Sequence, residues 1–484
     1  MDLKKQAIRG IKWTTLSSVS LAITQLLKIS VLARFLDKTD FGLMAIVMVV
    51  LGFTNLFVDM GLTSAILHKQ NITKNQYASL YWINFVFSFV LFIVVWFISP
   101  FVASFYNQPE LITLIPLMAL TIVFSAFGRQ FKVIEQKELN FRFISLVDIV
   151  GSILSLIFAI FLAYYGYGIY SLVYSVILLQ IISNTAFLIK GIKRIGIKLH
   201  FALAETRPFL KIGIYQVGGQ IINYFNRDLD ILIIGKFFGT EILGSYSLAK
   251  QLVRRPLQII DPVITKVGLG VFPKYQNDNK RLSELFSKVL TILGGINIVV
   301  YGTILLLAPY IVRLLYGNNF EDIIILVQLF TIIVYLRSLG GQAGVLVVTK
   351  GRTDVDFYWN IINLIIFPVF IYIGSQYSII WVIINIAVMQ IFMTIPAWFF
   401  FYKRLINMSF NMYIKPIVIP MLLSGIVLLL NFVVLNNTIL SQVISTSILY
   451  IIIFIYLYNV SSEFKKIINE KLLNHARIYF KNRR

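Results

Sequence analysis

The stretch that decides the fold runs from Gly213 to Asp261 and reads GIYQVGGQIINYFNRDLDILIIGKFFGTEILGSYSLAKQLVRRPLQIID. It is apolar enough for two membrane-spanning helices, at about 212–233 and 242–262, yet seven charged residues fall within those two helices. They are Arg227, Asp228, Asp230, Lys250, Arg254, Arg255 and Asp261. A charge that faces lipid costs at least about 2.5 kcal/mol, so these side chains must face protein or water. We therefore expect this stretch to line a cavity within a membrane protein.

The first helix of the stretch carries polar residues at steps of four, three, four and three positions. They are Gln216, Gln220, Asn223, Arg227 and Asp230. Residues at these spacings share one face of an α-helix, and the other faces here are Ile, Leu, Val, Tyr and Phe. The pattern predicts one polar stripe on an otherwise apolar membrane helix.

The same features occur a second time near the N-terminus. An ungapped shift of 202 positions pairs residues of the same kind, namely Arg34 with Lys236, Phe35 with Phe237, Gly42 with Gly244 and Asp59 with Asp261. The same shift maps the polar stripe onto Thr14, Ser18, Leu21, Gln25 and Lys28, four of which are polar. Several matches in one register indicate an internal duplication, which is the usual construction of secondary transporters.

The composition indicates an all-α polytopic membrane protein. Apolar residues make up 58% of the chain, and the mean hydropathy is +0.83. The absence of cysteine excludes thiolate chemistry, and the three scattered histidines form no metal-binding pattern. We find no Walker-type phosphate loop and no long outer loop with clustered catalytic residues. We therefore expect neither an enzyme nor a resident metal or cofactor.

Apolar runs bounded by charges, proline or glycine predict about fourteen transmembrane helices in groups of six, six and two. With the duplication, this grouping predicts two pseudo-symmetric six-helix lobes around a central cavity, followed by two further helices. The predicted parts are an N-terminal lobe at 1–189, a basic cytoplasmic hinge at 190–211, a C-terminal lobe at 212–401, the last two helices at 402–459 and a basic cytoplasmic tail at 460–484.

The distribution of charge predicts the orientation. Of the 43 Lys and Arg residues, 33 fall on the side of the N-terminus, four on the opposite side and six within spans. The positive-inside rule then places both termini in the cytoplasm. This asymmetry also accounts for the formal net charge of +22, so we expect no nucleic-acid partner.

Four motifs follow one another near the N-terminus. They are Leu32-Ala-Arg-Phe-Leu-Asp-Lys-Thr-Asp-Phe-Gly-Leu43, Asp59-Met-Gly-Leu62, Ser64-Ala-Ile-Leu67 and Thr73-Lys-Asn-Gln-Tyr77. This ordered set resembles the start of bacterial polysaccharide flippases of the Wzx type, and looks closest to the colanic-acid and teichuronic-acid exporters. These belong to the multidrug/oligosaccharidyl-lipid/polysaccharide superfamily. The similarity covers about the first 400 residues.

The resemblance implies a V-shaped pair of lobes around the cavity, in the bacterial cytoplasmic membrane. Flippases of this type carry a polyprenyl-diphosphate-linked oligosaccharide from the inner to the outer leaflet by alternating access, for O-antigen, capsule or exopolysaccharide synthesis. The implied partners are the lipid bilayer, this lipid-linked oligosaccharide, and the polysaccharide polymerase and export machinery.

Basic residues within the spans are the candidate substrate contacts. They are Arg227, Lys250, Arg254, Arg255, Lys28 and Arg337. A diphosphate that crosses hydrocarbon needs counter-charges, and the planar fork of arginine suits phosphate. Internal salt bridges to Asp228, Asp230 or Asp261 are the alternative role for these cations. The candidate polar lining of the cavity consists of Gln216, Gln220, Asn223, Thr14, Ser18 and Gln25.

Four carboxylates are candidates for ion coupling or for gating. Asp148 and Asp230 are the candidates for coupling transport to H⁺ or Na⁺, because an ionisable residue inside a membrane span usually has a function. Asp59 and Asp261 are related by the duplication and lie at the inner ends of two spans. For this second pair a structural role, such as holding a helix end, is favoured.

Three other functions compete with this interpretation. A cation-coupled drug exporter or a flippase for the peptidoglycan precursor would share the fold. A drug exporter for cationic compounds needs a carboxylate-rich cavity, whereas the cations predicted here would repel such compounds. A membrane polysaccharide polymerase or ligase would have a similar number of spans, but it typically needs a large outer catalytic loop.

Overall fold

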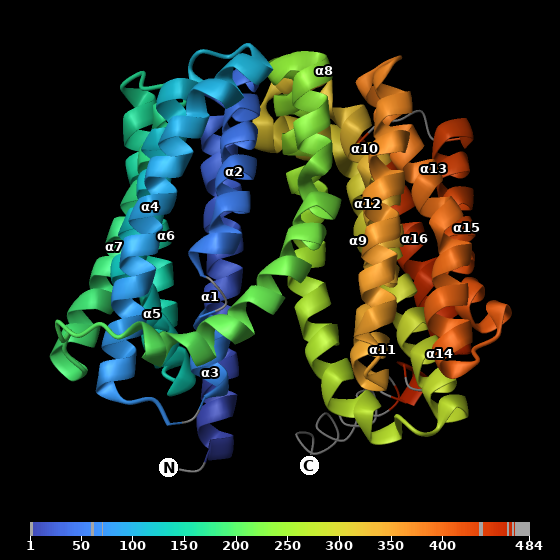
Figure 1. The fold of residues 1–484 in the computed structure, drawn as a ribbon. Coiled ribbons are helices and arrows are strands. Elements are labelled where there is room, and N and C mark those ends of the chain that lie inside the picture. The colour runs from blue at the N-terminus through green and yellow to red at the C-terminus, as the bar shows by residue number, and fades with distance from the viewer. Residues whose placement is uncertain are drawn as a thin grey trace, which may run out of the picture. The chain divides into compact units, whose positions relative to one another are not determined.

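The computed structural model describes residues 3–59, 62–69, 71–434, 439–461, 464–466 and 469 (Figure 1). Within these ranges every regular element is a helix, which confirms the expected all-α architecture. Most of the expected basic tail at 460–484 lies outside the described residues.

Seven helices precede the helix that contains residues 213–261. They are α1 (Leu3–Leu32), α2 (Lys38–Val58), α3 (Leu62–His68), α4 (Lys74–Tyr106), α5 (Leu111–Lys137), α6 (Phe141–Tyr164) and α7 (Tyr170–Arg194). All except the short α3 are long and apolar enough to cross a membrane. They supply the six spans expected of the first repeat.

The central element is α8 (Leu203–Val271), which is 69 residues long. A straight helix of that length would extend over about 100 Å, far more than the thickness of a bilayer. Gly239 interrupts it with φ 78° and ψ −178°, a backbone conformation that glycine alone adopts readily. The helix therefore has a first arm (203–238) and a second arm (240–271). The described residues contain thirteen candidate spans, one fewer than the fourteen expected, because parts of both arms fall within a single span, Gly218–Tyr275.

The remaining chain is also helical. Its elements are the 3₁₀ turn η1 (Phe272–Tyr275), α9 (Asn279–Tyr316), the 3₁₀ turn η2 (Asn318–Phe320), α10 (Ile323–Gly340), α11 (Gln342–Lys350), α12 (Thr353–Ser375), α13 (Ile379–Ala397), the π-helix η3 (Trp398–Lys403), α14 (Arg404–Ile406), α15 (Phe410–Val434) and α16 (Ile439–Val460). Together α10 and α11 make one candidate span, joined at Gly341.

The chain folds into two compact units. Unit 1 consists of Met1–Leu248, Leu314–Phe320 and Asn363–Ser375, and unit 2 consists of Ala249–Arg313, Glu321–Ile362 and Gln376–Arg484. The border between them falls within the second arm of α8. Unit 1 therefore contains the whole first repeat and three segments of the second.

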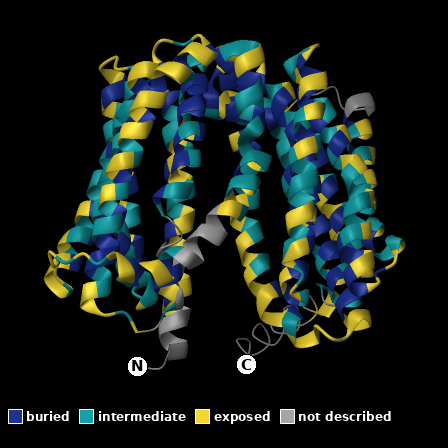
Figure 2. Ribbon diagram, in the orientation of Figure 1, coloured by how far each residue is buried: buried dark blue, intermediate teal, exposed yellow. Residues whose placement is uncertain are grey.

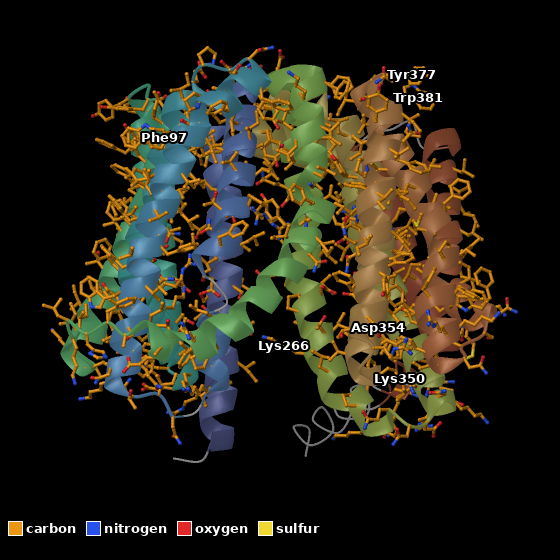
Figure 3. The ribbon with its side chains drawn as sticks, viewed as in Figure 1. Phe97, Lys266, Lys350, Asp354, Tyr377 and Trp381 are labelled. Atoms are coloured by element: carbon orange, nitrogen blue, oxygen red, sulfur yellow. The ribbon has the colours of Figure 1, made fainter. Side chains whose placement is uncertain are left out.

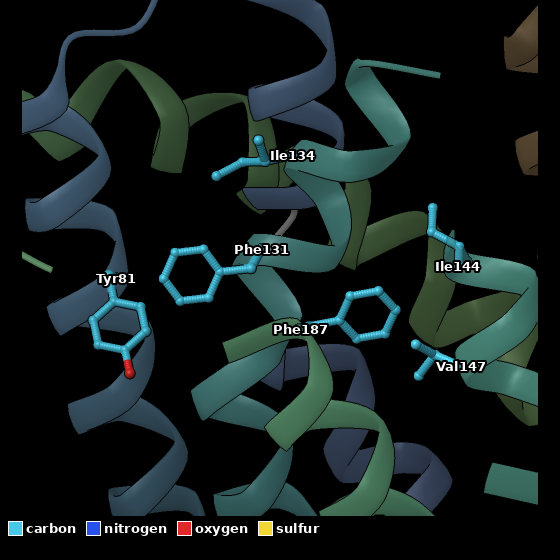
Figure 4. Close-up of a cluster of buried hydrophobic side chains, with 6 residues drawn as sticks. All are labelled: Tyr81, Phe131, Ile134, Ile144, Val147 and Phe187. Carbon is cyan, nitrogen blue, oxygen red and sulfur yellow. The ribbon is translucent and has the colours of Figure 1, made fainter. Parts of the chain in front are cut away.

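A cluster of buried side chains joins four helices of unit 1 (Figure 4). It contains Tyr81 of α4, Phe131 and Ile134 of α5, Ile144 and Val147 of α6, and Phe187 of α7. A glycine permits close approach beside this cluster, because a Cβ on Gly128 of α5 would lie only 2.5 Å from the backbone of Asn184 in α7. Small residues of this kind let membrane helices pack closely.

Large apolar side chains remain exposed along the helices (Figure 2). Phe97 of α4 is 72% exposed and lies at the edge of unit 1 (Figure 3). Such a surface is unfavourable in water, whereas lipid tails are as apolar as these side chains. The burial pattern is thus typical of a multi-pass membrane protein.

Candidate functional site

The two arms of α8 are joined by a buried polar contact. The hydroxyl of Tyr246 on the second arm donates a hydrogen bond of 2.6 Å to Asp230 on the first. Asp230 also accepts from the backbone N–H of Ile231 at 2.9 Å, and it is only 3% exposed. This member of the predicted polar stripe therefore packs inside unit 1.

Three other members of the stripe remain exposed on the first arm. They are Gln220, Asn223 and Arg227. The Arg227 side chain is 53% exposed, its Nε donates to Asp228 at 2.7 Å, and its guanidinium lies 5.2 Å from the centre of the Tyr224 ring. The side chain of Gln216 lies outside the described residues.

Packing of Tyr224 against α2 sets the rotation of the first arm. Its hydroxyl donates to the backbone carbonyl of Val49, and its ring is almost fully buried. A Cβ on Gly52 would lie 2.7 Å from this hydroxyl, so glycine provides the space for the ring. With Tyr224 held in this way, Arg227 is left on the accessible side of the arm.

The corresponding stripe on α1 is also largely exposed. Ser18 and Gln25 are exposed and Thr14 is partly buried. Lys28 differs, because its Nζ donates to Ser155 of α6 at 3.2 Å. Lys28 is thus attached to the packed interior of the first repeat.

Asp148 lies in an ion pair of unit 1. Its Oδ1 is 2.9 Å from Nζ of Lys132 on α5, and the two side chains are 20% and 34% exposed. Lys132 also lies 5.4 Å from the ring centre of Phe187. A candidate coupling carboxylate therefore has a cationic partner on the neighbouring helix.

Asp59 stands at the C-terminal end of α2. It follows the last residue of the helix and accepts a hydrogen bond from the hydroxyl of Thr63. Arg129 of α5 interacts electrostatically with Asp59, and its Nη2 donates to Asn55 at 3.5 Å. The sequence analysis did not single out Arg129, since the apolar run of this span ends at residue 128. The polar residues that follow this apolar run keep the helical spacing as far as Lys137, and this spacing could have identified them as part of the helix.

The second arm of α8 carries three candidate cations into unit 2. Lys250 is 5% exposed, while Arg254 and Arg255 are partly buried. Nη1 of Arg255 donates to Gln258 at 3.2 Å, one turn further along the arm. These cations are therefore held within a packed helix.

Asp261 and the backbone carbonyl of Arg337 both lie close to Gly341 in unit 2. A Cβ on Gly341 would lie 3.3 Å from Oδ1 of Asp261, and the N–H of Gly341 donates to the carbonyl of Arg337 at 3.1 Å. Tyr301 of α9 interacts electrostatically with Asp261. The carboxylate thus lies against the junction of α10 and α11, where glycine allows close approach.

The expected hinge segment is attached to α4. Trp82 Nε1 donates to the carbonyl of Lys198 at 2.9 Å, and the hydroxyl of Ser79 donates to Glu205 at 2.7 Å. His200 Nε2 is 3.2 Å from the same carboxylate. The Ser79 hydrogen bond, followed by those of His200, lowers the pKa of Glu205 below its ordinary value. Residues 198–205 of this segment are therefore held by α4 of the first repeat.

Each unit contains part of the predicted site. Unit 1 contains the described stripe residues, Arg227, Lys28 and three of the carboxylates, Asp59, Asp148 and Asp230. Unit 2 contains Lys250, Arg254, Arg255, Arg337 and Asp261. The exposed guanidinium of Arg227 is the member of unit 1 best suited to contact an anion.

Comparison with known proteins gives a consistent result. A family model described as "Polysaccharide biosynthesis protein" matches residues 31–325. The lipopolysaccharide biosynthesis protein WzxC of Escherichia coli (strain K12) is 28% identical over 425 residues, covering 88% of this chain and 86% of WzxC. The amylovoran biosynthesis protein AmsL of Erwinia amylovora is 34% identical over 316 residues, covering 63% of this chain and 79% of AmsL.

A solved structure shares the fold. The lipid II flippase MurJ, in an inward closed conformation, superimposes with a TM-score of 0.74 at 15% sequence identity. The match covers 93% of this chain and 99% of that one. At this identity the similarity establishes the architecture and leaves the cargo to be argued from the residues.

Proposed function

The chain belongs to the family of polysaccharide biosynthesis proteins, and on this premise we propose that it is a flippase for a polyprenyl-diphosphate-linked oligosaccharide. It moves this substrate from the inner to the outer leaflet of the bacterial cytoplasmic membrane by alternating access of its two repeats. Both termini lie in the cytoplasm, and the end where α1 meets α2 faces outward. The polysaccharide polymerase and export machinery act on the delivered product.

The observation that carries this proposal is the exposed guanidinium of Arg227 on a membrane helix. Its side chain is 53% exposed on the polar face of a helix that packs through Tyr224 on α2. A diphosphate needs a cation when it leaves water, and a guanidinium donates two hydrogen bonds to phosphate oxygens at once. We therefore assign Arg227 as the residue that binds the diphosphate of the substrate.

The charges of the second arm support the same substrate class. Lys250, Arg254 and Arg255 add three cations within two helical turns, and Arg337 adds one on α10. A group of cations disfavours a cationic drug as cargo, because like charges repel most strongly where water is scarce. An anionic lipid such as a peptidoglycan precursor remains the rival that shares this chemistry.

A transport assay in proteoliposomes tests the proposal. The probe is a fluorescent polyprenyl-diphosphate oligosaccharide, and the readout is its movement between leaflets. We expect the wild type to move the probe. Arg227→Ala should lower the rate of movement about tenfold or more, which corresponds to the loss of one charge-assisted hydrogen bond, and Arg227→Lys should restore part of this rate. Lys266→Ala is the matched control, because Lys266 is an exposed cation on the same helix (Figure 3).

The outcomes separate the candidates. If the wild type moves the probe and Arg227→Ala matches it, the assignment of Arg227 is wrong. If the wild type moves lipid II alone, the peptidoglycan-precursor flippase replaces the present proposal. Export of a small cation instead of either lipid would support a drug exporter.

A further inference from the structure

A cation at the end of α1 caps the end of α9. Nη2 of Arg34 donates to the backbone carbonyl of Leu314 at 3.0 Å. Leu314 lies in the last turn of α9, where carbonyls have no partner within the helix and carry the negative end of the helix dipole. The Arg34 side chain reaches this carbonyl beside Gly317, which has φ 92° and lacks a side chain in the way.

A second cation makes the equivalent contact at the end of α4. Nζ of Lys236 donates to the backbone carbonyl of Phe105 at 2.6 Å and lies 4.7 Å from the centre of its ring. Phe105 is in the last turn of α4. Tyr106, the next residue, donates its hydroxyl to the carbonyl of Leu232 at 3.2 Å on the first arm of α8. The first arm is therefore attached to α4 by two side chains.

The two contacts are related by the internal duplication. Arg34 and Lys236 are 202 positions apart, in the same register as the other repeat matches. The cation of the first repeat caps a helix of the second, and the cation of the second repeat caps a helix of the first. The repeats are thus connected reciprocally at one end of unit 1.

The backbones of α2 and α8 also approach each other closely in unit 1. A Cβ on Gly42 of α2 would lie 1.8 Å from the carbonyl oxygen of Thr240, and a Cβ on Gly244 would lie 1.8 Å from that of Lys38. Gly42 and Gly244 are 202 positions apart, as are Lys38 and Thr240. The residues of this crossing are therefore paired in the same register as the two cations.

We propose that Arg34 and Lys236 form a two-part clasp that holds the α1–α2 end of the protein closed, and that transport requires both contacts to break in each cycle. This inference rests on the proposed alternating access. Opening this end separates the repeats, so each cation must leave its helix carbonyl. Because both acceptors are backbone carbonyls at helix ends, the clasp re-forms in one geometry each time the end closes.

Accessibility labelling tests the clasp in the full chain, which contains no native cysteine. The reporter is Ala45→Cys, because Ala45 is 8% exposed and lies one turn beyond Gly42 on α2. A membrane-impermeant maleimide is added from the side opposite the termini. We expect Arg34→Ala and Lys236→Ala each to raise the labelling rate about tenfold, and the double variant about a hundredfold, since two charge-assisted bonds hold one end.

Two matched variants keep the test decisive. Arg313→Ala removes a cation next to Leu314 that pairs with Glu321 at 2.8 Å, and it should leave labelling unchanged. Arg34→Lys retains a donor and should restore protection. Labelling that stays at the wild-type rate in the double variant, or that rises equally in Arg313→Ala, would overturn the clasp. Because the readout needs no substrate, a failure of lipid transport would overturn the proposed function and leave the clasp standing.

Discussion

Tyr246 donates a hydrogen bond of 2.6 Å to Asp230, and this bond joins the two arms of α8 beside their turn at Gly239. Both side chains are buried, at 0% and 3% exposure. Gly239 supplies the bend, but a turn alone does not hold two membrane helices together. The buried hydrogen bond between Tyr246 and Asp230 holds the beginning of the second arm against the first arm. It thereby helps to orient the helix face that carries Arg227.

Removing the Tyr246 hydroxyl should destabilise this turn. Tyr246→Phe keeps the ring and deletes one donor to a buried carboxylate, which should lower the free energy of unfolding by about 1–3 kcal/mol. Denaturation in detergent measures the change. Tyr164→Phe is the control, because Tyr164 is 74% exposed in the same unit. Equal stability of the two variants would show that the bond contributes nothing.

The glycine crossing predicts a steric effect. Gly42→Ala inserts a methyl group 1.8 Å from a backbone oxygen, so the helices must shift, at a cost of about 1–3 kcal/mol. Gly244→Ala should cost a similar amount, and the double variant less than the two together, because one displacement relieves both clashes. Denaturation of the four proteins measures these free energies.

Gly344→Ala provides the control for the crossing. Gly344 is also helical, and a Cβ there meets nothing within 4 Å. This variant should be neutral or slightly stabilising, since alanine is the better helix former. If Gly42→Ala behaved in the same way, the close backbone approach would be absent in the membrane.

The approximate number of spans, the duplication and the match of Gly42 with Gly244 were predictable from the sequence because each has a strong local signal. Hydropathy reports apolar length, and the shift of 202 positions preserves Gly42 and Gly244 because no other residue fits the crossing. The spacing of the polar stripe predicted a shared face. It did not predict that Asp230 is buried while Arg227 is exposed, since the difference depends on Tyr246 and Tyr224 from other turns.

Helix ends and ion-pair partners were less predictable for a physical reason. The apolar run of α5 ends near residue 128, but the helix continues to Lys137, so Arg129 and Lys132 belong to it. Hydropathy detects the part of a helix that matches the hydrocarbon, whereas a helix can extend beyond it with charged residues. The partner of Asp148 was missed for this reason.

The attachment of the hinge segment should depend on pH. The hydrogen bonds of Ser79 and His200 hold the pKa of Glu205 below its ordinary value of 4.5. A lowered pKa in the folded state stabilises the fold above 4.5, and this contribution is lost as the pH falls through the lower, folded-state value. We expect acid to loosen residues 198–206 from α4, measured as faster proteolysis of this segment.

Two variants check the origin of this pH dependence. Glu205→Gln should abolish it, because the side chain no longer titrates. Ser79→Ala should move the loss to higher pH, since it removes the largest cause of the lowered pKa. Proteolysis that follows the same pH profile in all three proteins would assign the effect to another group.

The Asp148–Lys132 pair distinguishes a coupling carboxylate from a structural one. With side chains 20% and 34% exposed, breaking the pair by Asp148→Asn should cost only about 1 kcal/mol of stability. If Asp148 exchanges Lys132 for H⁺ or Na⁺ during transport, Asp148→Asn should lose the response of flipping to an ion gradient while basal flipping persists.

The exchanged variant Asp148→Lys with Lys132→Asp restores the ion pair with its carboxylate on α5. We expect it to recover stability without recovering the gradient response, because the acid now lies on the wrong helix. Flipping that again responds to the gradient in this variant would show that the pair serves only to hold α5 and α6 together.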